Sequence, residues 1–216
     1  DYLEIFDGNS TSAPSLGQYC NTLTGSPGTI ISSGGAITIY LYADQSVNGR
    51  GFEVDWSCSY PANSLTYVPD DNFEQALIDL GYDTDSILND SVPTSQISNI
   101  AYLNIYNDSI SDLTGIEDFT ALVDLLCGEN QLTSLDLSFN TSLDWLDCQS
   151  NQLTSINLNS NNLLSSLNCN SNQITSLDVS SNVSLRAISC SGNLISNLDL
   201  SLNDSLEVLS CSGNLI

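Results

Sequence analysis

The sequence predicts a mainly β protein in which a β-sandwich unit is followed by a solenoid of stacked coils with parallel strands. Two observations support this prediction. One pattern recurs every 21 residues between positions 122 and 216. Before it, over residues 1–58, apolar and polar residues alternate in segments separated by Gly, Ser and Pro clusters, as in strands joined by turns. A short helix is expected to cap the solenoid at its N-terminal end.

Residues 1–58 contain alternating segments at 2–6, 37–42 and 52–56, which we expect to form strands. Four runs in this region resemble the later strands of a CUB domain, an extracellular β-sandwich. They are D-Y-L-E-I-F-D-G from Asp1, L-G-Q-Y-C from Leu16, A-D-Q-S from Ala43 and G-F-E-V from Gly51. The resemblance implies that residues 1–58 are the C-terminal part of a CUB domain whose first strands precede Asp1.

Many members of the CUB family hold a calcium ion, and the resemblance assigns three residues of this sequence to such a site. Asp1 and Asp44 match acidic positions, and Ser46 would offer its backbone carbonyl. Hard oxygen ligands of this kind suit calcium. The upstream acidic ligand of the family has no counterpart in this sequence. The alternative is that Asp44 only shapes a turn.

Residues 59–69 contain two prolines and no clear period, which predicts a short linker. A helix is expected next, with Asp70 or Asp71 as its N-cap and Gly81 at its end. Residues 70–121 would then form the N-terminal cap and the first, irregular repeats. Four apolar residues at helical spacing are expected to cover the open end of the solenoid core: Phe73, Ala76, Leu77 and Leu80.

Residues 122–216 repeat the pattern L-x-x-L-x-C-x-x-N-x-L-x-x-L-D-L-x-x-N-x-x, which is that of a leucine-rich repeat. Leu125 and Cys127 point to the same side of a short strand, and we expect Leu135 and Leu137 to do so on a returning strand. A single coil cannot bury these side chains. Each coil must therefore stack on the next, with neighbouring strands ~4.8 Å apart.

Cysteine and asparagine occupy fixed positions of the repeat. Free Cys behaves as a small buried hydrophobe, and zinc sites need convergent Cys or His spacing that a chain without His lacks. Side chains stacked in register also point in parallel, which disfavours disulfides between coils. We expect the asparagines to bond to turn backbone inside the stack. The cysteines are Cys127, Cys148, Cys169, Cys190 and Cys211, and the asparagines are Asn130, Asn151, Asn172, Asn193 and Asn214, with a second set at Asn140, Asn161, Asn182 and Asn203.

Residues 68–216 resemble the cysteine-containing, nested, internalin-like leucine-rich repeats of secreted bacterial surface proteins. The resemblance implies an extracellular or cell-surface location. The chain has no Met and its last repeat ends without a polar capping unit, so we expect it to be part of a longer protein.

The charge balance limits the partners of this chain. Its 216 residues include 26 Asp and Glu but 2 basic residues, Arg50 and Arg186, giving a net charge of -24. This composition disfavours nucleic acids and anionic membranes as partners, and leaves cations, basic proteins and neutral glycans. The sequence contains no run of eighteen apolar residues, so it does not predict a membrane-spanning helix. The sequence does not indicate an oligomeric state.

The sequence predicts a non-catalytic protein. It has no His for a triad and no Lys for a Schiff base, and it lacks nucleotide-binding glycine motifs. Its repeated carboxylates form a ladder rather than a facing pair. The expected function is a binding or adhesion module that recognises protein or glycan. The alternatives are an accessory region of a secreted hydrolase whose catalytic domain lies outside these residues, and a spacer without a ligand.

The two halves of the coil differ in how much they vary. Ser134, Asp136 and Ser138 recur with little change in later coils, which indicates a structural role. The other half varies, and we expect its Trp145 to stand in solvent beside Leu126 as a binding anchor. The alternative is that Trp145 shields the edge of the cap. The candidate ligand-binding residues are Asp124, Leu126, Asp144, Trp145, Asp147, Asn168 and Arg186.

Overall fold

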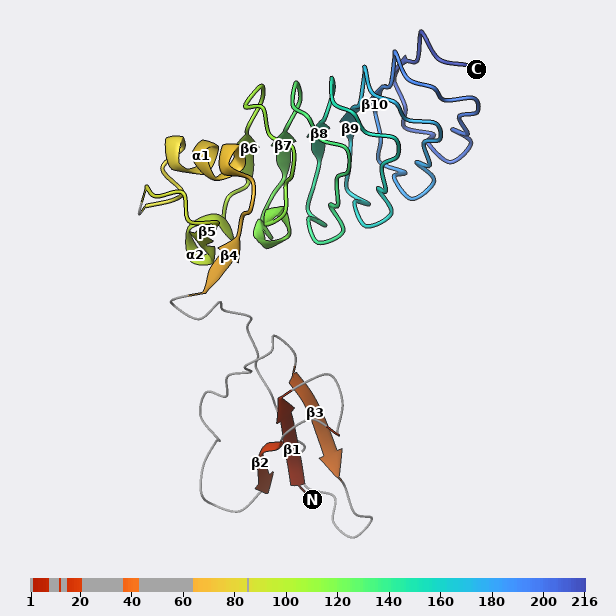
Figure 1. Ribbon diagram of the computed structural model, residues 1–216. Helices are drawn as coiled ribbons and strands as arrows, with labels where there is room; N and C mark the ends of the chain where they lie inside the picture. Colours follow the sequence, from red (N-terminus) through yellow and green to blue (C-terminus); the bar gives the residue numbers. More distant parts are fainter. Residues whose placement is uncertain (1, 8–11, 13–14, 21–36, 43–63, 85) are drawn as a thin grey trace. The chain divides into compact units, whose positions relative to one another are not determined.

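The structure is a computed structural model that describes residues 2–7, 12, 15–20, 37–42, 64–84 and 86–216 (Figure 1). The chain divides into two compact units, Asp1–Ser57 and Cys58–Ile216. The strand expected over 52–56 lies outside the described residues. None of the helices in the described residues has the length and apolar character needed to cross a membrane.

The first unit contains a three-stranded antiparallel sheet. Its strands are β1 (Tyr2–Asp7), β2 (Ser15–Cys20) and β3 (Ile37–Tyr42), in the order β2-β1-β3. The pairing of β1 with β2 shifts its register between Ile5 and Phe6. This irregularity accompanies the burial of these two consecutive apolar residues, which a regular strand would turn to opposite faces.

The second unit begins with the cap, which consists of a small sheet and two helices. Strand β4 (Leu65–Tyr67) pairs antiparallel with β5 (Ser91–Pro93), and the helices are α1 (Asp71–Asp79) and α2 (Thr94–Ile97). The C-terminal part of the predicted linker therefore forms a strand. In β4, Thr66 donates its hydroxyl at 2.6 Å to Oδ2 of Asp118, the last residue of the short 3-10 helix η1 (Ile116–Asp118).

Asp70 is the residue that begins α1. Its Oδ1 atom accepts hydrogen bonds from the backbone N–H groups of Asn72 and Phe73, both at 3.0 Å. Its Oδ2 atom accepts from the backbone N–H groups of Ser111 and Asp112 and from the Ser111 hydroxyl, at 2.9, 3.0 and 2.7 Å. One carboxylate thus caps the helix and fixes it to the first coil.

The C-terminal end of α1 confirms the prediction for Gly81 but not the prediction for Leu80. Gly81 ends the helix with a left-handed φ of 78°, and the N–H of Tyr82 donates to the carbonyl of Leu77 at 2.8 Å. The prediction that Leu80 faces the core is wrong, because the helix ends at Asp79 and Leu80 is 43% exposed.

The helix covers the N-terminal end of the solenoid core, as predicted. Phe73 and Leu77 have no exposed surface, and the Phe73 ring stacks on Phe119 of the first coil with 6.2 Å between ring centroids. Figure 1 shows α1 next to the first strand of the solenoid. The apolar residues of the irregular first repeat are buried with them: Leu103, Ile105, Ile110, Leu113 and Ile116.

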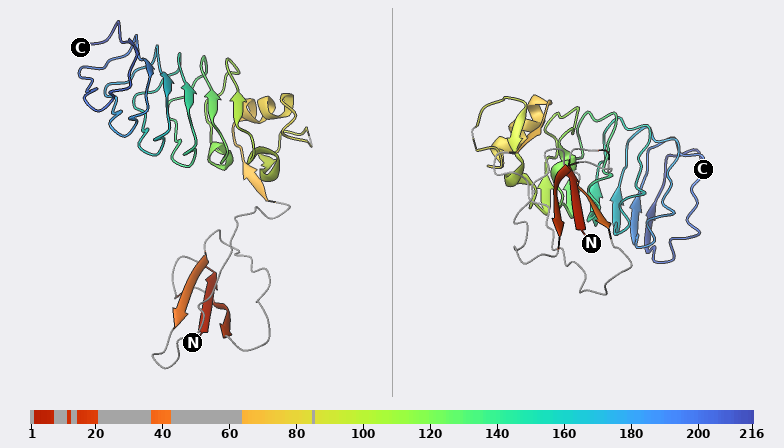
Figure 2. Two further views of the ribbon diagram at one scale, coloured as in Figure 1. Left: turned by 180° about the vertical axis from the view of Figure 1, so that it is seen from behind. Right: turned by 90° about the horizontal axis from the view of Figure 1, so that it is seen from below.

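The solenoid contributes one short parallel strand per coil. These strands are β6 (Tyr102–Asn104), β7 (Asp124–Leu126), β8 (Trp145–Asp147), β9 (Ser166–Asn168), β10 (Ala187–Ser189) and β11 (Val208–Ser210). They pair in sequence order, and both views of Figure 2 show consecutive coils side by side. The middle residue of each strand from β6 to β10 is buried in the core.

The predicted returning strand does not form. We define the return segment as residues 133–139 and their equivalents at 21-residue intervals, and it contains turns but no strand. Asp136 accepts a hydrogen bond at Oδ1 from the backbone N–H of Ser138 at 3.0 Å, and this local turn replaces the extended ladder. The backbone N–H of Ser138 also lowers the pKa of Asp136. Leu137 is buried and Leu135 partly so.

The repeat cysteines form part of the core. Cys127, Cys148, Cys169 and Cys190 are buried, as predicted, whereas Cys211 in the last coil is only partly buried. All five are free thiols. Burial raises the pKa of Cys169 to about 12, so this thiol stays protonated and unreactive at neutral pH.

The asparagine ladders are structural, as predicted. Asn151 donates through Nδ2 to the carbonyls of Cys127 and Cys148, at 3.0 and 3.1 Å. In the second set, Asn161 donates to the carbonyls of Leu137 and Asn140, at 3.1 and 2.9 Å. Asn151 therefore bonds to the backbone of its own coil and of the coil before it, whereas both acceptors of Asn161 belong to the coil before it.

Candidate functional site

The outward-pointing residues of the parallel sheet form one surface, which we call the strand face. It consists of the first and third residues of each strand from β6 to β11, together with the residue preceding each strand. The register places equivalent positions of neighbouring coils side by side. The first positions are Tyr102, Asp124, Trp145, Ser166, Ala187 and Val208, and the third positions are Asn104, Leu126, Asp147, Asn168, Ser189 and Ser210.

All seven candidate ligand-binding residues lie on this strand face, between β7 and β10. Trp145 is 39% exposed. The expectation that it stands beside Leu126 is wrong, because Trp145 is a first-position residue whereas Leu126 is a third-position residue. The parallel register instead places Asp124 and Ser166 on either side of Trp145.

The third-position side chains serve mainly to end the strands. Asp147 accepts a hydrogen bond from the backbone N–H of Gln149 at 3.1 Å, and Asn168 accepts one from the N–H of Asn170 at 3.3 Å. The side-chain oxygens of Asp147 and Asn168, which were predicted to contact a ligand, are therefore already engaged in local turns. Leu126 occupies the same column and cannot accept a hydrogen bond.

Arg186 is also engaged within the protein. Its guanidinium lies 3.6 Å from a carboxylate oxygen of Glu207, and both side chains are well exposed. Arg186 is the one basic residue in the part of the chain that the structure describes. An exposed pair of this kind contributes little to stability, so a ligand can compete for either partner.

The first-position side chains of β6, β7 and β8 are different. Tyr102 is 50% exposed, and it lies next to Asp124, which in turn lies next to Trp145. Within the described residues, no side-chain hydrogen bond or ion pair involves any of these three. Together with the exposed Asp144, which precedes β8, they are polar and aromatic groups of the strand face that remain available to a ligand.

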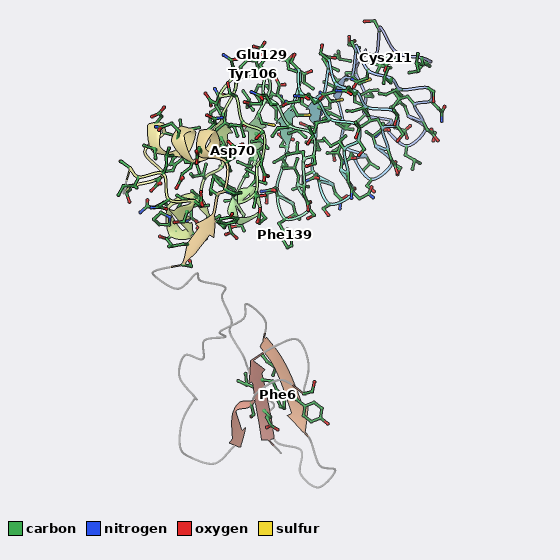
Figure 3. All side chains as sticks on the ribbon, in the orientation of Figure 1. Phe6, Asp70, Tyr106, Glu129, Phe139 and Cys211 are labelled. Carbon is green, nitrogen blue, oxygen red and sulfur yellow. The ribbon has the colours of Figure 1, made fainter. Side chains whose placement is uncertain are left out.

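A second cluster, which sequence reasoning missed, lies beyond the ends of these strands. Tyr106 donates its hydroxyl to Glu129 at 2.7 Å, and Figure 3 labels these two residues near each other. The Tyr106 hydroxyl also accepts from Gln149 at 3.3 Å, so its hydrogen bonds connect three coils. The hydrogen bond to Glu129 raises the pKa of Tyr106. Gly128 leaves room for the ring, because a Cβ there would approach it to 2.7 Å. Gly128 occupies the repeat position at which the next coil has Gln149. This change to glycine was the sequence feature that could have indicated a large side chain packed at this position.

The cap contains a group of three carboxylates, Asp71, Glu74 and Asp90, whose oxygens lie within 4.8 Å of one another. Glu74 is fully buried, and its two oxygens accept four hydrogen bonds from backbone N–H groups of residues 89–91, at 3.0 to 3.1 Å. A metal ion would have to displace these donors. The group therefore serves as an anchor for the loop before β5.

Two shallow hollows lie on the return segments rather than on the strand face. One, of about 290 Å³, is next to Asp178 and Asp199, and the other, of about 280 Å³, is next to Asp136 and Phe139. Phe139 is 67% exposed and projects into solvent, as Figure 3 shows. The carboxylates of these hollows are already used in local turns, so the strand face remains the better candidate.

Known proteins resemble the two units separately. The CUB domain family model matches residues 1–56. Internalin J from Listeria monocytogenes serotype 4b (strain F2365) is 37% identical over 75 residues, which is 35% of this chain and 8% of internalin J. Cubilin from Homo sapiens is 38% identical over 61 residues, which is 28% of this chain and 2% of cubilin.

A solved internalin (inlF) from Listeria monocytogenes is 26% identical in sequence, with a TM-score of 0.51 over 56% of this chain and 38% of that chain. The chain combines a CUB domain with an internalin-like leucine-rich repeat. It spans less than a tenth of the length of internalin J and of cubilin.

These likenesses favour a binding module of the leucine-rich-repeat and CUB type. In the internalin-like repeat, the available side chains gather on β6 to β8, near the cap. In the CUB region, the expected calcium ligands Asp1, Asp44 and Ser46 fall within the matched residues 1–56. They lie outside the described residues.

Proposed function

We propose that this chain is a non-catalytic, extracellular binding module that contacts a protein or glycan ligand through the strand face of its internalin-like repeat. The observation that carries the proposal is the column of Tyr102, Asp124 and Trp145, in which both aromatic residues are exposed and Asp124 is partly exposed. The side chains of the three have no hydrogen-bond or ion-pair partner within the described residues. Aromatic side chains of this kind are enriched among residues that dominate binding energy.

The scaffold beneath this column supports the proposal. The strands carry it on a continuous hydrogen-bonded ladder, and the buried residues Leu103, Leu125 and Leu146 fix their inner side. Two aromatic side chains on a rigid sheet lose little conformational freedom when a ligand binds. The face is therefore preorganised for recognition.

The composition and the return segments support the non-catalytic assignment. The chain has no His or Lys, and the described return-segment carboxylates Asp136, Asp178 and Asp199 each accept a local backbone hydrogen bond. They lie along one side of the solenoid rather than across a cleft. An accessory region of a secreted hydrolase, the alternative function, would use the same strand face to hold the substrate.

Trp145→Ala is expected to weaken ligand binding by about 2 kcal/mol or more, because it removes one of the two aromatic anchors of the column. A ligand would first be identified by screening glycan and protein arrays with the 216-residue chain, and affinities would then be measured by calorimetry. Asp178→Ala, on the return segment, is the matched control and should change affinity little. A loss of affinity in Asp178→Ala with none in Trp145→Ala would move the site to the return segments.

We also propose that the CUB region binds calcium weakly through Asp1, Asp44 and the backbone carbonyl of Ser46, with the CUB match to residues 1–56 as support. Calorimetric titration of the chain with calcium should give a small binding heat. Asp44→Ala should abolish that heat, whereas Asp178→Ala, which removes the same charge from the repeat, should preserve it. An unchanged heat in Asp44→Ala would exclude this ligand set.

A further inference from the structure

We propose that the column of Tyr102, Asp124 and Trp145 recognises a cationic side chain, an arginine or lysine in a basic segment of a protein partner. This inference rests on the proposed binding function and narrows its ligand from protein or glycan to a basic protein segment. The argument depends on the spacing of the three side chains, on their availability and on the charge around them.

The spacing suits a cation. Tyr102, Asp124 and Trp145 are direct neighbours on three consecutive parallel strands. Because neighbouring strands lie ~4.8 Å apart, the carboxylate stands midway between two aromatic side chains that are about 10 Å apart at their bases. A cation bound over the carboxylate is then flanked by both rings within the roughly 6 Å range of cation–π attraction. The carboxylate supplies the charge, and the rings exclude water from its sides.

The carboxylate at the centre has no internal counter-ion within the described residues. The described basic residue, Arg186, lies three coils further along and forms its ion pair with Glu207. Asp147 is the other acidic residue at the first and third positions of β7 and β8. It is nearly buried and accepts a hydrogen bond from the backbone N–H of Gln149. Asp124 is therefore the first- or third-position carboxylate of β7 and β8 that a cation from another molecule can pair with, and it is the one that lies between two aromatic side chains.

The surrounding charge favours a cation over a neutral sugar. The chain carries 26 acidic residues against 2 basic ones. Asp144, which immediately precedes β8, is exposed and adds negative charge beside Trp145. Such a field steers basic segments toward the face and adds nothing to the binding of a neutral glycan.

The test uses the indole N–H signal of Trp145 in NMR spectra of the 216-residue chain, assigned with Trp145→Phe because the chain has 2 Trp. The probes are N-acetyl-arginine amide and its neutral analogue N-acetyl-citrulline amide. We expect a saturable shift with the arginine probe and about tenfold weaker binding, or none, with the citrulline probe. Asp124→Asn should weaken arginine binding about fivefold or more. Asp178→Asn, which removes the same charge from the return segment, should not.

Two results of the comparison between the arginine and citrulline probes and between the two Asn variants would overturn the inference. One is an equal response to arginine and citrulline, and the other is an equal loss in Asp124→Asn and Asp178→Asn, which would indicate general charge attraction. A neutral oligosaccharide that shifts the Trp145 signal when the arginine probe does not would reject the basic partner and keep the proposed strand-face function. A ligand that binds with unchanged affinity to Trp145→Ala would reject both.

Discussion

Glu74→Ala is expected to lower the free energy of unfolding of the repeat unit by about 3 to 5 kcal/mol, because it leaves several backbone donors without a partner. The Glu74 side chain has no exposed surface, and its carboxylate accepts the N–H groups of Asn89, Asp90 and Ser91. These bonds hold the loop that leads into β5, which pairs with β4. Urea denaturation followed by circular dichroism measures the change.

Two further variants separate an anchor from a metal site. Glu74→Gln keeps the shape but points an amide N–H₂ at backbone donors, so it should still destabilise by about 2 kcal/mol. Asp71→Asn removes an exposed carboxylate of the same group and should change stability by less than about 0.5 kcal/mol. If Asp71→Asn destabilised as strongly as Glu74→Gln, or if calcium restored the loss, the group would act as a metal site instead.

The sequence predicted the solenoid well because a strict period imposes the same environment at every equivalent position. Leu146 and Cys148 are buried because the coils on both sides place Leu and Cys columns next to them. The same reasoning correctly gave Asn151 a structural role. Helix capping at Asp70 and termination at Gly81 also followed from local chemistry, since both depend on residues within one or two turns.

The errors arose where distant or competing interactions decide the outcome. Alternation around Leu135 and Leu137 predicted a strand, but the Asp136 side chain takes the backbone N–H of Ser138 and favours a turn. The neighbour of Trp145 was a different kind of error, because the 21-residue period already pairs position 145 with position 124 rather than with Leu126. Glu74 belongs to a residue type that is rarely buried, and its donors lie fifteen or more residues further along the chain.

Asn151→Ala is expected to destabilise the repeat by about 3 to 4 kcal/mol, because its side chain serves two coils at once. It donates to carbonyls of Cys127, Cys148 and Gln149 at 3.0 to 3.2 Å, and it accepts from the N–H of Leu132 at 2.9 Å. Alanine leaves the buried N–H of Leu132 without this acceptor. It also removes one of the two donors from each carbonyl, since Cys127 keeps Asn130, Cys148 keeps Asn172 and Gln149 keeps the N–H of Glu129. Stability in a solenoid is a sum of coils and interfaces, so losing one interface near the middle also uncouples the coils on either side.

Two asparagines provide the matched controls. Asn157→Ala makes the same chemical change at an exposed residue that accepts one local hydrogen bond, from the N–H of Asn159, and should cost about 1 kcal/mol or less. Asn214→Ala changes the same column in the last coil, where the side chain is less buried, and should give an intermediate loss. Equal losses for Asn157→Ala and Asn151→Ala in urea denaturation would contradict the ladder as a source of coupling. Slow amide hydrogen exchange in the coils on both sides of position 151 in Asn151→Ala would also contradict this role of the ladder, because a solenoid uncoupled at that interface must open first at that interface.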